Sequence, residues 1–248
     1  MTGTSGWREF IGNSAWAEID PTGTAQGRGE PQPPFQVAPT EATPDIQLPE
    51  PPAGFGLRPF REVLAARRSR RKFTEEPVTL EELSFLLWAT QGLQKVIRGG
   101  VATLRTVPSG GARHPFETIL VLRSVTGVAP ARYRYAPSRH GLLRTGDIPS
   151  TGEVSAACVG QDFVACAPVV FFWTAVPSRT EWRYGPASGK LIAIDAGHLC
   201  QNLYLACEAL GLGTCAIGAY DQELSDRVAG VDGDSELVVY AAPVGRPS

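Results

Sequence analysis

A long apolar helix near the carboxyl end constrains the fold of this chain more than any other segment. The pattern predicts this helix from Ile192 to Leu210, and two glycines, Gly211 and Gly213, end it. Earlier in the chain, the continuous apolar run at 169–174 is typical of a buried strand. Elements this apolar are stable only when other layers cover them, so they predict the centre of a layered domain.

The remaining elements mix helices and strands without a strict βαβ repeat. Thr79 and Glu82 form a capping box that begins one helix, and Gly92 ends it. The other expected elements are a short helix from Pro59 with an apolar face of Phe60, Val63 and Leu64, a strand at 117–125, a hairpin at 133–135 and 140–144, a helix at 222–228 and a last strand at 236–240. This mixture predicts an α+β sandwich rather than a doubly wound sheet.

The first 56 residues differ in composition from the rest. They are rich in proline and show no sustained period, so they cannot form a regular core of their own. Two interpretations remain open, a disordered tail or an extended arm that wraps over a partner subunit. Large apolar residues favour the arm: Trp7, Phe10, Trp16, Phe35 and Ile46. We therefore divide the chain into a Pro-rich extended N-terminal arm, 1–56, and a domain, 57–248.

Composition excludes several classes of protein. The chain is 43% hydrophobic and 19% charged, as globular proteins are, and its apolar runs are too short for a membrane helix. The opening MTGTSGWREF lacks the features of a secretory signal, so we expect a soluble, cytoplasmic protein without a membrane partner. Five cysteines without a CxxC pair predict neither disulfides nor a metal site, and a pI near 6.0 predicts no general attraction to nucleic acid.

The segment RRSRRKF, at 67–73, is the strongest local concentration of charge. It lies between two predicted helices, so it forms a tight connection or the start of a strand. A nucleic-acid patch, a solvated face and an anion site are the alternatives. In the anion site, Ser69 supplies a hydroxyl, and Arg67 and Arg71 supply forked donors to phosphate oxygens.

Two glycine-rich segments are candidates for ligand contact. The paired glycines of PSGGAR, at 108–113, let the backbone approach a planar ligand closely. GLGTCAIG, at 211–218, follows a helix instead of opening one, so it is not a dinucleotide fingerprint. We expect a helix end that leads into a loop whose amides face a ligand.

The three histidines show no metal-binding spacing. His114 follows the PSGGAR segment and is a candidate for lining a ligand cavity. His198 lies within the long apolar helix, where a hydrogen-bonded core position is expected. His140 belongs to the turn of the predicted hairpin.

Several segments, taken in order, carry a resemblance to a known family. They are Arg67-Arg68-Ser69-x-Arg71-x-Phe73 followed by LEELSFLLWATQGL, then PSGGARHPFE, YRYAPSRHGLLR, DAGHLCQNLYLACEALGLGTCAIGA and the final PVGRP. Together they resemble the FMN-dependent nitroreductase family and, within it, the SagB-type dehydrogenase branch. The resemblance covers residues 57–248.

The resemblance implies a nitroreductase-like sandwich with a mixed or antiparallel central sheet flanked by helices, in an intertwined homodimer with FMN at the interface. It implies phosphate, ribityl or pyrimidine contacts for Arg67, Arg68, Ser69 and Arg71, completion of the phosphate clamp by Arg246, and ring contacts for Pro108, Ser109, Gly111, Ile217 and Gly218. An amide near Gly218 or Ala219 is then expected to reach flavin N5. Such a donor favours the reduced flavin.

The azoline dehydrogenases of this branch have a Lys-Tyr pair that is thought to assist proton removal. This chain has Arg183 and Tyr184 at that place. A guanidinium is a poor general base, although it can bind a carboxylate or polarise a carbonyl, so Tyr184 is left as the proton-transfer group. Alternatively, Tyr184 and Trp182 only pack the wall of the site.

The expected function is therefore hydride transfer between flavin N5 and a small-molecule or peptide substrate. One possibility is reduction of nitro, quinone or enone groups with NAD(P)H. Another is oxidation of a peptide-derived natural-product precursor. The alternative is a non-catalytic flavin-binding or docking subunit of a peptide-modifying complex.

Overall fold

The predicted buried strand is present and lies in the middle of the sheet. The computed structural model describes residues 5–12, 16, 19–97 and 100–248, and β7 spans Val169–Ala175. Phe171 and Trp173 pack into one hydrophobic core, whereas Val170 and Phe172 pack into a second core on the opposite face. Both faces of β7 are covered, which is why its sequence is apolar at every position instead of every second one.

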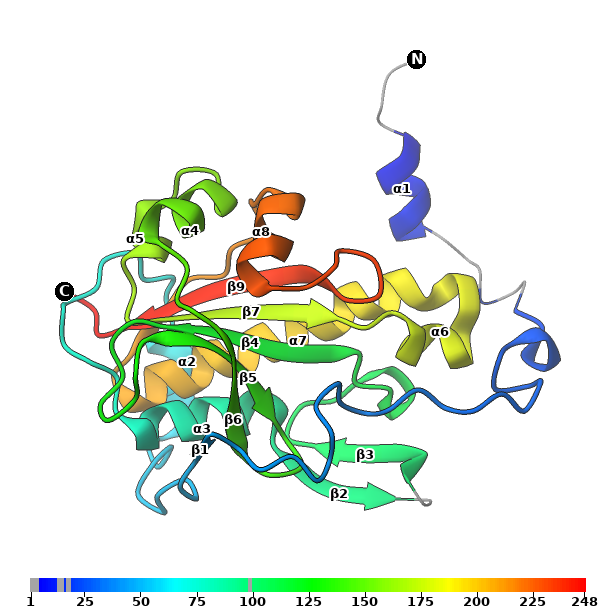
Figure 1. The fold of residues 1–248 in the computed structure, drawn as a ribbon, viewed down its shortest axis with the longest axis horizontal. Helices are drawn as coiled ribbons and strands as arrows, with labels where there is room; N and C mark the ends of the chain where they lie inside the picture. Colours follow the sequence, from blue (N-terminus) through cyan, green and yellow to red (C-terminus); the bar gives the residue numbers. More distant parts are fainter. Residues whose placement is uncertain (1–4, 13–15, 17–18, 98–99) are drawn as a thin grey trace.

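Seven strands form the central sheet, in the order β1-β6-β5-β4-β7-β9-β8 (Figure 1). Every strand pairing in it is antiparallel, and an isolated parallel bridge joins Ser69 to Thr214 beside its last strand. The strands are β1 (Ile46–Gln47), β4 (Phe116–Leu122), β5 (Ala131–Ala136), β6 (Gly141–Gly146), β8 (Gly213–Thr214) and β9 (Leu237–Gly245). A separate hairpin consists of β2 (Leu93–Ile97) and β3 (Ala102–Arg105).

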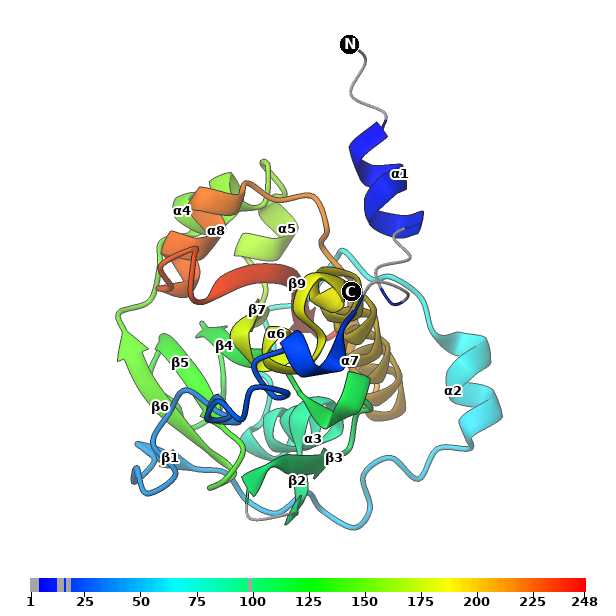
Figure 2. The same cartoon turned by 90° about the vertical axis from the view of Figure 1, so that its right-hand side faces the viewer.

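Helices cover both faces of the sheet, so the predicted α+β sandwich is confirmed (Figure 1). One face carries α3 (Leu80–Gln91) and the long α7 (Ser188–Leu210), with α2 (Phe60–Ala66) beside α7 (Figure 2). The other face carries α4 (Thr151–Ala157), α5 (Asp162–Ala165) and α8 (Gln222–Ala229). The remaining helices are α1 (Ser5–Gly12) and α6 (Ser178–Tyr184).

The sequence signals for helix ends are confirmed. Thr79 and Glu82 form the predicted capping box, with Glu82 N donating to Thr79 Oγ1 at 3.1 Å. Gly211 ends α7 in a left-handed conformation with φ of 73°. The helix predicted at 222–228 is also present as α8, which Asp221 caps and Gly230 ends. The apolar face predicted for α2 is only partly buried, because Val63 is covered while Phe60 and Leu64 are 66% and 47% exposed.

The described part of the N-terminal arm contacts its own domain. β1 pairs with β6, Gln36 is buried, and the indole nitrogen of Trp182 donates to Glu30 O at 2.9 Å. α1 projects away from the layers (Figure 2). Residues 1–4, 13–15 and 17–18 of the arm lie outside the described residues, and so does the side chain of Trp7. The domain boundary near residue 57 stays a prediction.

Two further findings bear on the composition. Within the ranges that the structure describes, we find no helix with the length and apolarity that crossing a bilayer requires. Cys200 and Cys207 are buried in the core between α7 and the sheet, because residues seven positions apart lie on the same face of a helix.

Candidate functional site

The basic segment 67–73 runs as extended chain between β8 and the carboxyl end. Arg70 N donates to Thr214 O at 2.9 Å, and Thr74 N donates to Arg246 O at 2.9 Å. Phe73 forms an antiparallel bridge with Pro247. The prediction of a tight connection or strand start is confirmed, because α2 ends at Ala66 and sheet-like contacts begin three residues later.

The cations of this segment have few partners. Arg67 lies over the ring of Tyr204, with its guanidinium carbon 5.2 Å from the ring centre. Arg68 and Arg71 are exposed, and among the described residues no carboxylate forms an ion pair with either one or with Arg67. Their charge is therefore available for an anion.

Tyr204 joins the basic segment to the loop after α7. Its hydroxyl lies 2.9 Å from Ser69 Oγ and accepts a hydrogen bond from Ala216 N at 2.8 Å. The hydroxyl of Thr214, 1% exposed, has no hydrogen-bond partner among the described residues. Sequence reasoning missed Tyr204, because a tyrosine within an apolar helix gives no signal of its own.

Arg246, which the resemblance assigns to the phosphate clamp, is partly buried and is paired with two carboxylates. Its Nη2 donates to Glu82 Oε1 at 2.9 Å, and its Nε also forms an ion pair with Glu76. These carboxylates raise the pKa of Arg246. These contacts use Nε and Nη2 of the guanidinium, and completion of the phosphate clamp by Arg246 stays a prediction.

The PSGGAR segment is tied to α7 by a buried carboxylate. Ser109 Oγ donates to Asp195 Oδ2 at 2.5 Å, and Gly110 N donates to the same carboxylate at 3.2 Å. Asp195 is 5% exposed, and burial raises its pKa. Pro108 and Gly111 stay exposed, so this anchored turn presents its backbone to the surface. Sequence reasoning did not find Asp195, because its partners are 85 and 86 residues away.

Arg183 and Tyr184 lie at the end of α6, against this glycine turn. Gly111 has a φ of 59°, and a Cβ atom there would collide with the hydroxyl of Tyr184. The guanidinium of Arg183 lies over the ring of Tyr184 at 5.5 Å, and Trp16 packs edge-on against the same ring at 5.3 Å. Trp182, on the same helix, is buried. The structure therefore brings Tyr184, Arg183 and Gly111 together.

The loop after α7 exposes backbone amides, whereas the side chain of Ile217 is buried. Ile217 is 2% exposed, packs into the core beneath α4 and α8, and exchanges both backbone hydrogen bonds with Ala241. The prediction that Ile217 packs against a flavin ring is not supported for that reason. Gly218 is exposed, and within the described residues the amides of Gly218 and Ala219 donate no hydrogen bond. These amides are open to a ligand.

The histidines lie in three different environments. His114 is 5% exposed with Nε2 3.1 Å from Thr103 O, and burial, aided by the charge of Arg105, lowers its pKa to about 3. His140 lies in the hairpin turn, as predicted, with Nδ1 2.9 Å from Tyr135 OH. His198 was expected in the core, but its side chain is 44% exposed because it lies on a face of α7 that the sheet does not cover. Among the described residues, no cluster of His, Cys, Asp or Glu could hold a metal ion.

The candidate residues form two clusters, both fixed by α7. Asp195 anchors the cluster of the glycine turn and Tyr184, and Tyr204 anchors the cluster of the basic segment and the loop after α7. The two anchors are nine positions apart, which corresponds to about 14 Å and about half a turn around the helix. One copy of the chain thus presents the two clusters on different faces of α7.

Solved structures of nitroreductase-family proteins have the same layered α+β fold as this domain. The model of the nitroreductase family matches residues 64–246, so the chain belongs to the nitroreductase family. Membership of this family supports a flavin-dependent oxidoreductase in general terms.

Individual relatives agree with the family. A nitroreductase-family protein of Methanocaldococcus jannaschii is 37% identical over 82% of this chain and 97% of its own length. The trifolitoxin-processing protein TfxB of Rhizobium leguminosarum bv. trifolii is 28% identical over 57% of this chain and 39% of its own length, so the match spans well under half of that protein.

Solved structures show the same fold. A nitroreductase-family protein of Ralstonia eutropha superimposes with a TM-score of 0.67 at 28% identity, over 88% of this chain and 94% of the other. A family member of Desulfovibrio desulfuricans, crystallised in complex with FMN, has a TM-score of 0.52 at 19% identity, over 77% of this chain and 87% of the other. At that identity the second likeness shows the fold alone.

Proposed function

We propose that this chain is an FMN-dependent oxidoreductase of the SagB-type branch, which transfers hydride between flavin N5 and an organic substrate. The observation that carries the proposal is the set of unpaired polar groups around the basic segment. Arg67, Arg68 and Arg71 lack carboxylate partners within the described residues, in a chain whose formal net charge is -2. Acidic groups are plentiful, so leaving these cations unpaired favours a role in binding an anion.

The phosphate end of FMN fits this segment. Its dianion needs forked donors and hydroxyl groups, and Arg67, Arg71 and Ser69 supply both. The buried hydroxyl of Thr214 lacks a partner among the described residues and lies across the bridge from Ser69. A buried polar group of this kind is costly unless a further partner is present, so it supports a ligand at this place.

The ring end fits the two backbone segments. When bound, FMN supplies hydride transfer at N5. The free amides of Gly218 and Ala219 are suited to donate a hydrogen bond to that end of the ring, while Pro108 and Gly111 flank it. Tyr184 is the residue we assign to hold or move the substrate proton, and Arg183 is assigned to bind the substrate's carboxylate or carbonyl oxygen.

A second copy of the chain completes the site in this proposal. The two clusters face different sides of α7, so one copy supplies the phosphate contacts and the other the glycine turn. An apolar groove of about 390 Å³ lies between α2, α3 and α7, and Phe60 and Trp88 on its rim are 66% and 41% exposed. Exposed aromatic groups beside a hydrophobic groove favour a homodimer with FMN at its interface.

Two substrate classes remain within the proposal. Nitro, quinone or enone reduction uses NAD(P)H as electron donor. Oxidation of a peptide-derived natural-product precursor is favoured by the similarity to a trifolitoxin-processing protein. Arginine at position 183, in place of lysine, favours the first class or a peptide reaction that requires no lysine base.

Anaerobic addition of NADH or NADPH to the FMN-loaded protein tests the function. Bleaching of the flavin, followed by recovery when a nitro or quinone compound is added, is the expected result. Tyr184→Phe is the matched variant: its flavin should still bleach, while recovery with substrate slows. Colour that persists with every donor and every candidate precursor peptide would instead support a flavin-binding docking subunit.

A further inference from the structure

Helix α6, which ends in Arg183 and Tyr184, is held by one buried arginine. Arg179 is 3% exposed, and each of its nitrogens donates to a different part of the chain. Nε donates to Pro34 O at 2.7 Å, Nη1 to His114 O at 3.3 Å, and Nη2 to Glu117 Oε1 at 2.6 Å. A single guanidinium thus joins α6 to the N-terminal arm, to the end of the glycine turn and to β4.

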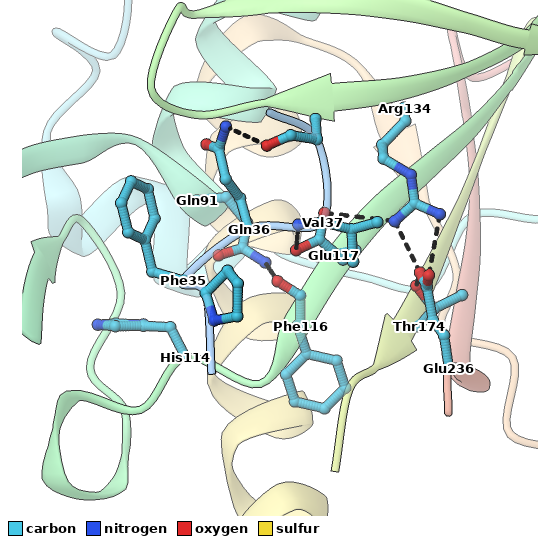
Figure 3. A network of polar contacts seen from close by, with 12 residues as sticks. Phe35, Gln36, Val37, Gln91, His114, Phe116, Glu117, Arg134, Thr174 and Glu236 are labelled. Atoms are coloured by element: carbon cyan, nitrogen blue, oxygen red, sulfur yellow. Dashed lines mark hydrogen bonds and ion pairs between the residues drawn. The ribbon is translucent and has the colours of Figure 1, made fainter. Parts of the chain in front are cut away.

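Glu117 is the acceptor that fixes this guanidinium. Its carboxylate is 3% exposed and accepts from Arg179, from Val37 N at 3.1 Å and from Arg134 Nη1 at 3.3 Å. Figure 3 shows Glu117 between Val37 of the arm and Arg134 of β5. In a water-poor interior such charge-assisted bonds define one geometry, because any displacement leaves a charge unpaired.

Within the described residues, the Arg134–Glu236 pair makes no hydrogen bond to α6. Arg134 forms a bidentate pair with Glu236, at 2.8 and 2.9 Å, and Thr174 also donates to Glu236 (Figure 3). Glu236 is 8% exposed, so it resembles Glu117 in burial and in its arginine partner. Of these two glutamates, Glu117 accepts hydrogen bonds from α6 and from the arm, whereas the partners of Glu236 in the described part of the chain are Arg134 and Thr174.

The arm holds α6 from a second side. The indole nitrogen of Trp182 donates to Glu30 O at 2.9 Å, and Gln26 N donates to Trp182 O at 2.8 Å. Arg113 of the glycine turn lies over the Trp182 ring at 5.2 Å. Residues 26–37 therefore act as a strap that crosses α6 and ends at the Glu117 carboxylate.

We propose that Glu117 is a positioning residue for Tyr184, acting through Arg179 and the strap. The proposal rests on the proposed function, in which Tyr184 serves the substrate beside the flavin. Tyr184 packs so closely on Gly111 that the turn has no room for a side chain. Movement of α6 therefore changes the place of the Tyr184 hydroxyl relative to the glycine turn that flanks the flavin ring.

Glu117→Gln and Glu236→Gln form a matched pair of variants. Each removes one buried negative charge from Arg134, so both should lower the melting temperature. With FMN content unchanged, we expect Glu117→Gln to lower kcat about tenfold, because small misplacement of a catalytic group is costly, and Glu236→Gln to change it less than about twofold. Equal losses in the two variants would show that the network is only structural.

Combination with Tyr184→Phe separates positioning from general damage. If Glu117 acts through the Tyr184 hydroxyl, Glu117→Gln should lower kcat less than about twofold when that hydroxyl is already absent. The same fold loss in both backgrounds would overturn the proposal. Arg179→Lys replaces Glu117→Gln if the latter does not fold, since it keeps the charge but loses the forked contacts.

Trp182 fluorescence tests the inference without turnover. The emission of Trp182, obtained as the difference between each protein and its Trp182→Phe derivative, should shift to the red in Glu117→Gln and stay unchanged in Glu236→Gln. Unchanged emission in both variants would overturn the proposal. A native protein that never reduces its flavin contradicts the proposed function instead, and this fluorescence result still decides the position of α6.

Discussion

Two sets of arginines in this protein differ in burial and, with it, in the partners that their guanidinium groups bind. The interior set donates to backbone carbonyl oxygens, to a side-chain amide oxygen and to carboxylates, and consists of Arg105, Arg134 and Arg179. Arg105, for example, donates to Gln91 Oε1 at 2.6 Å and to Phe35 O at 2.8 Å. Arg68 and Arg71 lie outside, without ion pairs among the described residues. The interior arginines hold the chain's own segments together, whereas the outer ones are the residues that we propose to bind a ligand.

The largest expected effect comes from the interior set. Arg179→Met removes the donor that joins the arm, the glycine turn and β4, and leaves the Glu117 carboxylate short of a partner. Breaking a buried pair in this way should lower the free energy of unfolding by about 3–5 kcal/mol. Urea denaturation measures the loss, and a loss below about 1 kcal/mol would contradict the role given to this set.

The pH dependence of stability tests whether burial and the nearby arginines keep His114 neutral in the folded chain. Burial, together with Arg105, Arg113 and Arg179, keeps His114 neutral, with a pKa of about 3 against an ordinary 6.5. As the pH falls, His114 is therefore protonated in the unfolded chain before it is protonated in the folded one. The contribution of neutral His114 to the free energy of unfolding is fully present above pH 6.5 and is lost as the pH drops from 6.5 towards 3. At about 1.4 kcal/mol per pH unit, His114 contributes a loss of about 2–3 kcal/mol by about pH 4.5.

His114→Asn is the control for this prediction. Asparagine tolerates the left-handed backbone of this position, where φ is 45°, and it does not titrate. The difference in stability between the native protein and this variant should shrink as the pH falls from 6.5. A difference that is constant with pH would show that His114 does not stay neutral in the folded chain.

The outer set should affect ligand binding more than folding. Replacing Arg67 and Ser69 by alanine removes a forked donor and a hydroxyl from the proposed phosphate site. We expect FMN affinity to fall about 10- to 100-fold, as the loss of charge-assisted bonds implies, with dimer stability reduced only through the lost ligand. Flavin titration of the apoprotein measures this, and full flavin occupancy in the double variant would refute the assignment.

The smallest effect is expected for a single exposed arginine. Arg68→Gln removes one outer charge that contacts no carboxylate among the described residues. The free energy of unfolding should change by less than about 0.5 kcal/mol. FMN binding should weaken by less than in the Arg67 and Ser69 double variant and become less sensitive to salt. Destabilisation comparable to that of Arg179→Met would erase the distinction between the two sets.

Much of the fold could be predicted because its signals are local. The capping box at Thr79, the glycine after α7 and the apolar run of β7 each report on neighbouring residues. α4 also begins with a capping box, Ser150 and Glu153, which could have predicted it. By contrast, α6 and the β2–β3 hairpin are held by their own arginines, Arg179 and Arg105, through acceptors in the arm that are far away in the sequence. Their local sequence therefore gives little indication of them.

The candidate site was also predictable only in part, namely where its signals are local in the sequence. Charge and glycine content point to the basic segment and the PSGGAR turn. Their supports, Tyr204 and Asp195, are single residues on an apolar helix and become visible only through contacts with distant segments. The surroundings of Arg246 and Ile217 were not predictable either: Glu82 of the α3 capping box bonds Arg246, and the second core covers the side chain of Ile217.

The short pairing of β1 with β6 has a consequence for how the protein behaves during synthesis. β6 is the strand next to the border of the sheet, and the arm covers part of its outer backbone, through Ile46 and Gln47 of β1 and through the Asp45 carboxylate, which accepts from Arg144 N at 2.7 Å. A chain that lacked the arm would leave these backbone groups of β6 unpaired at the edge of the sheet, where such groups recruit strands from other molecules. Shortened versions of this protein should therefore precipitate during expression, even where every flavin contact is retained.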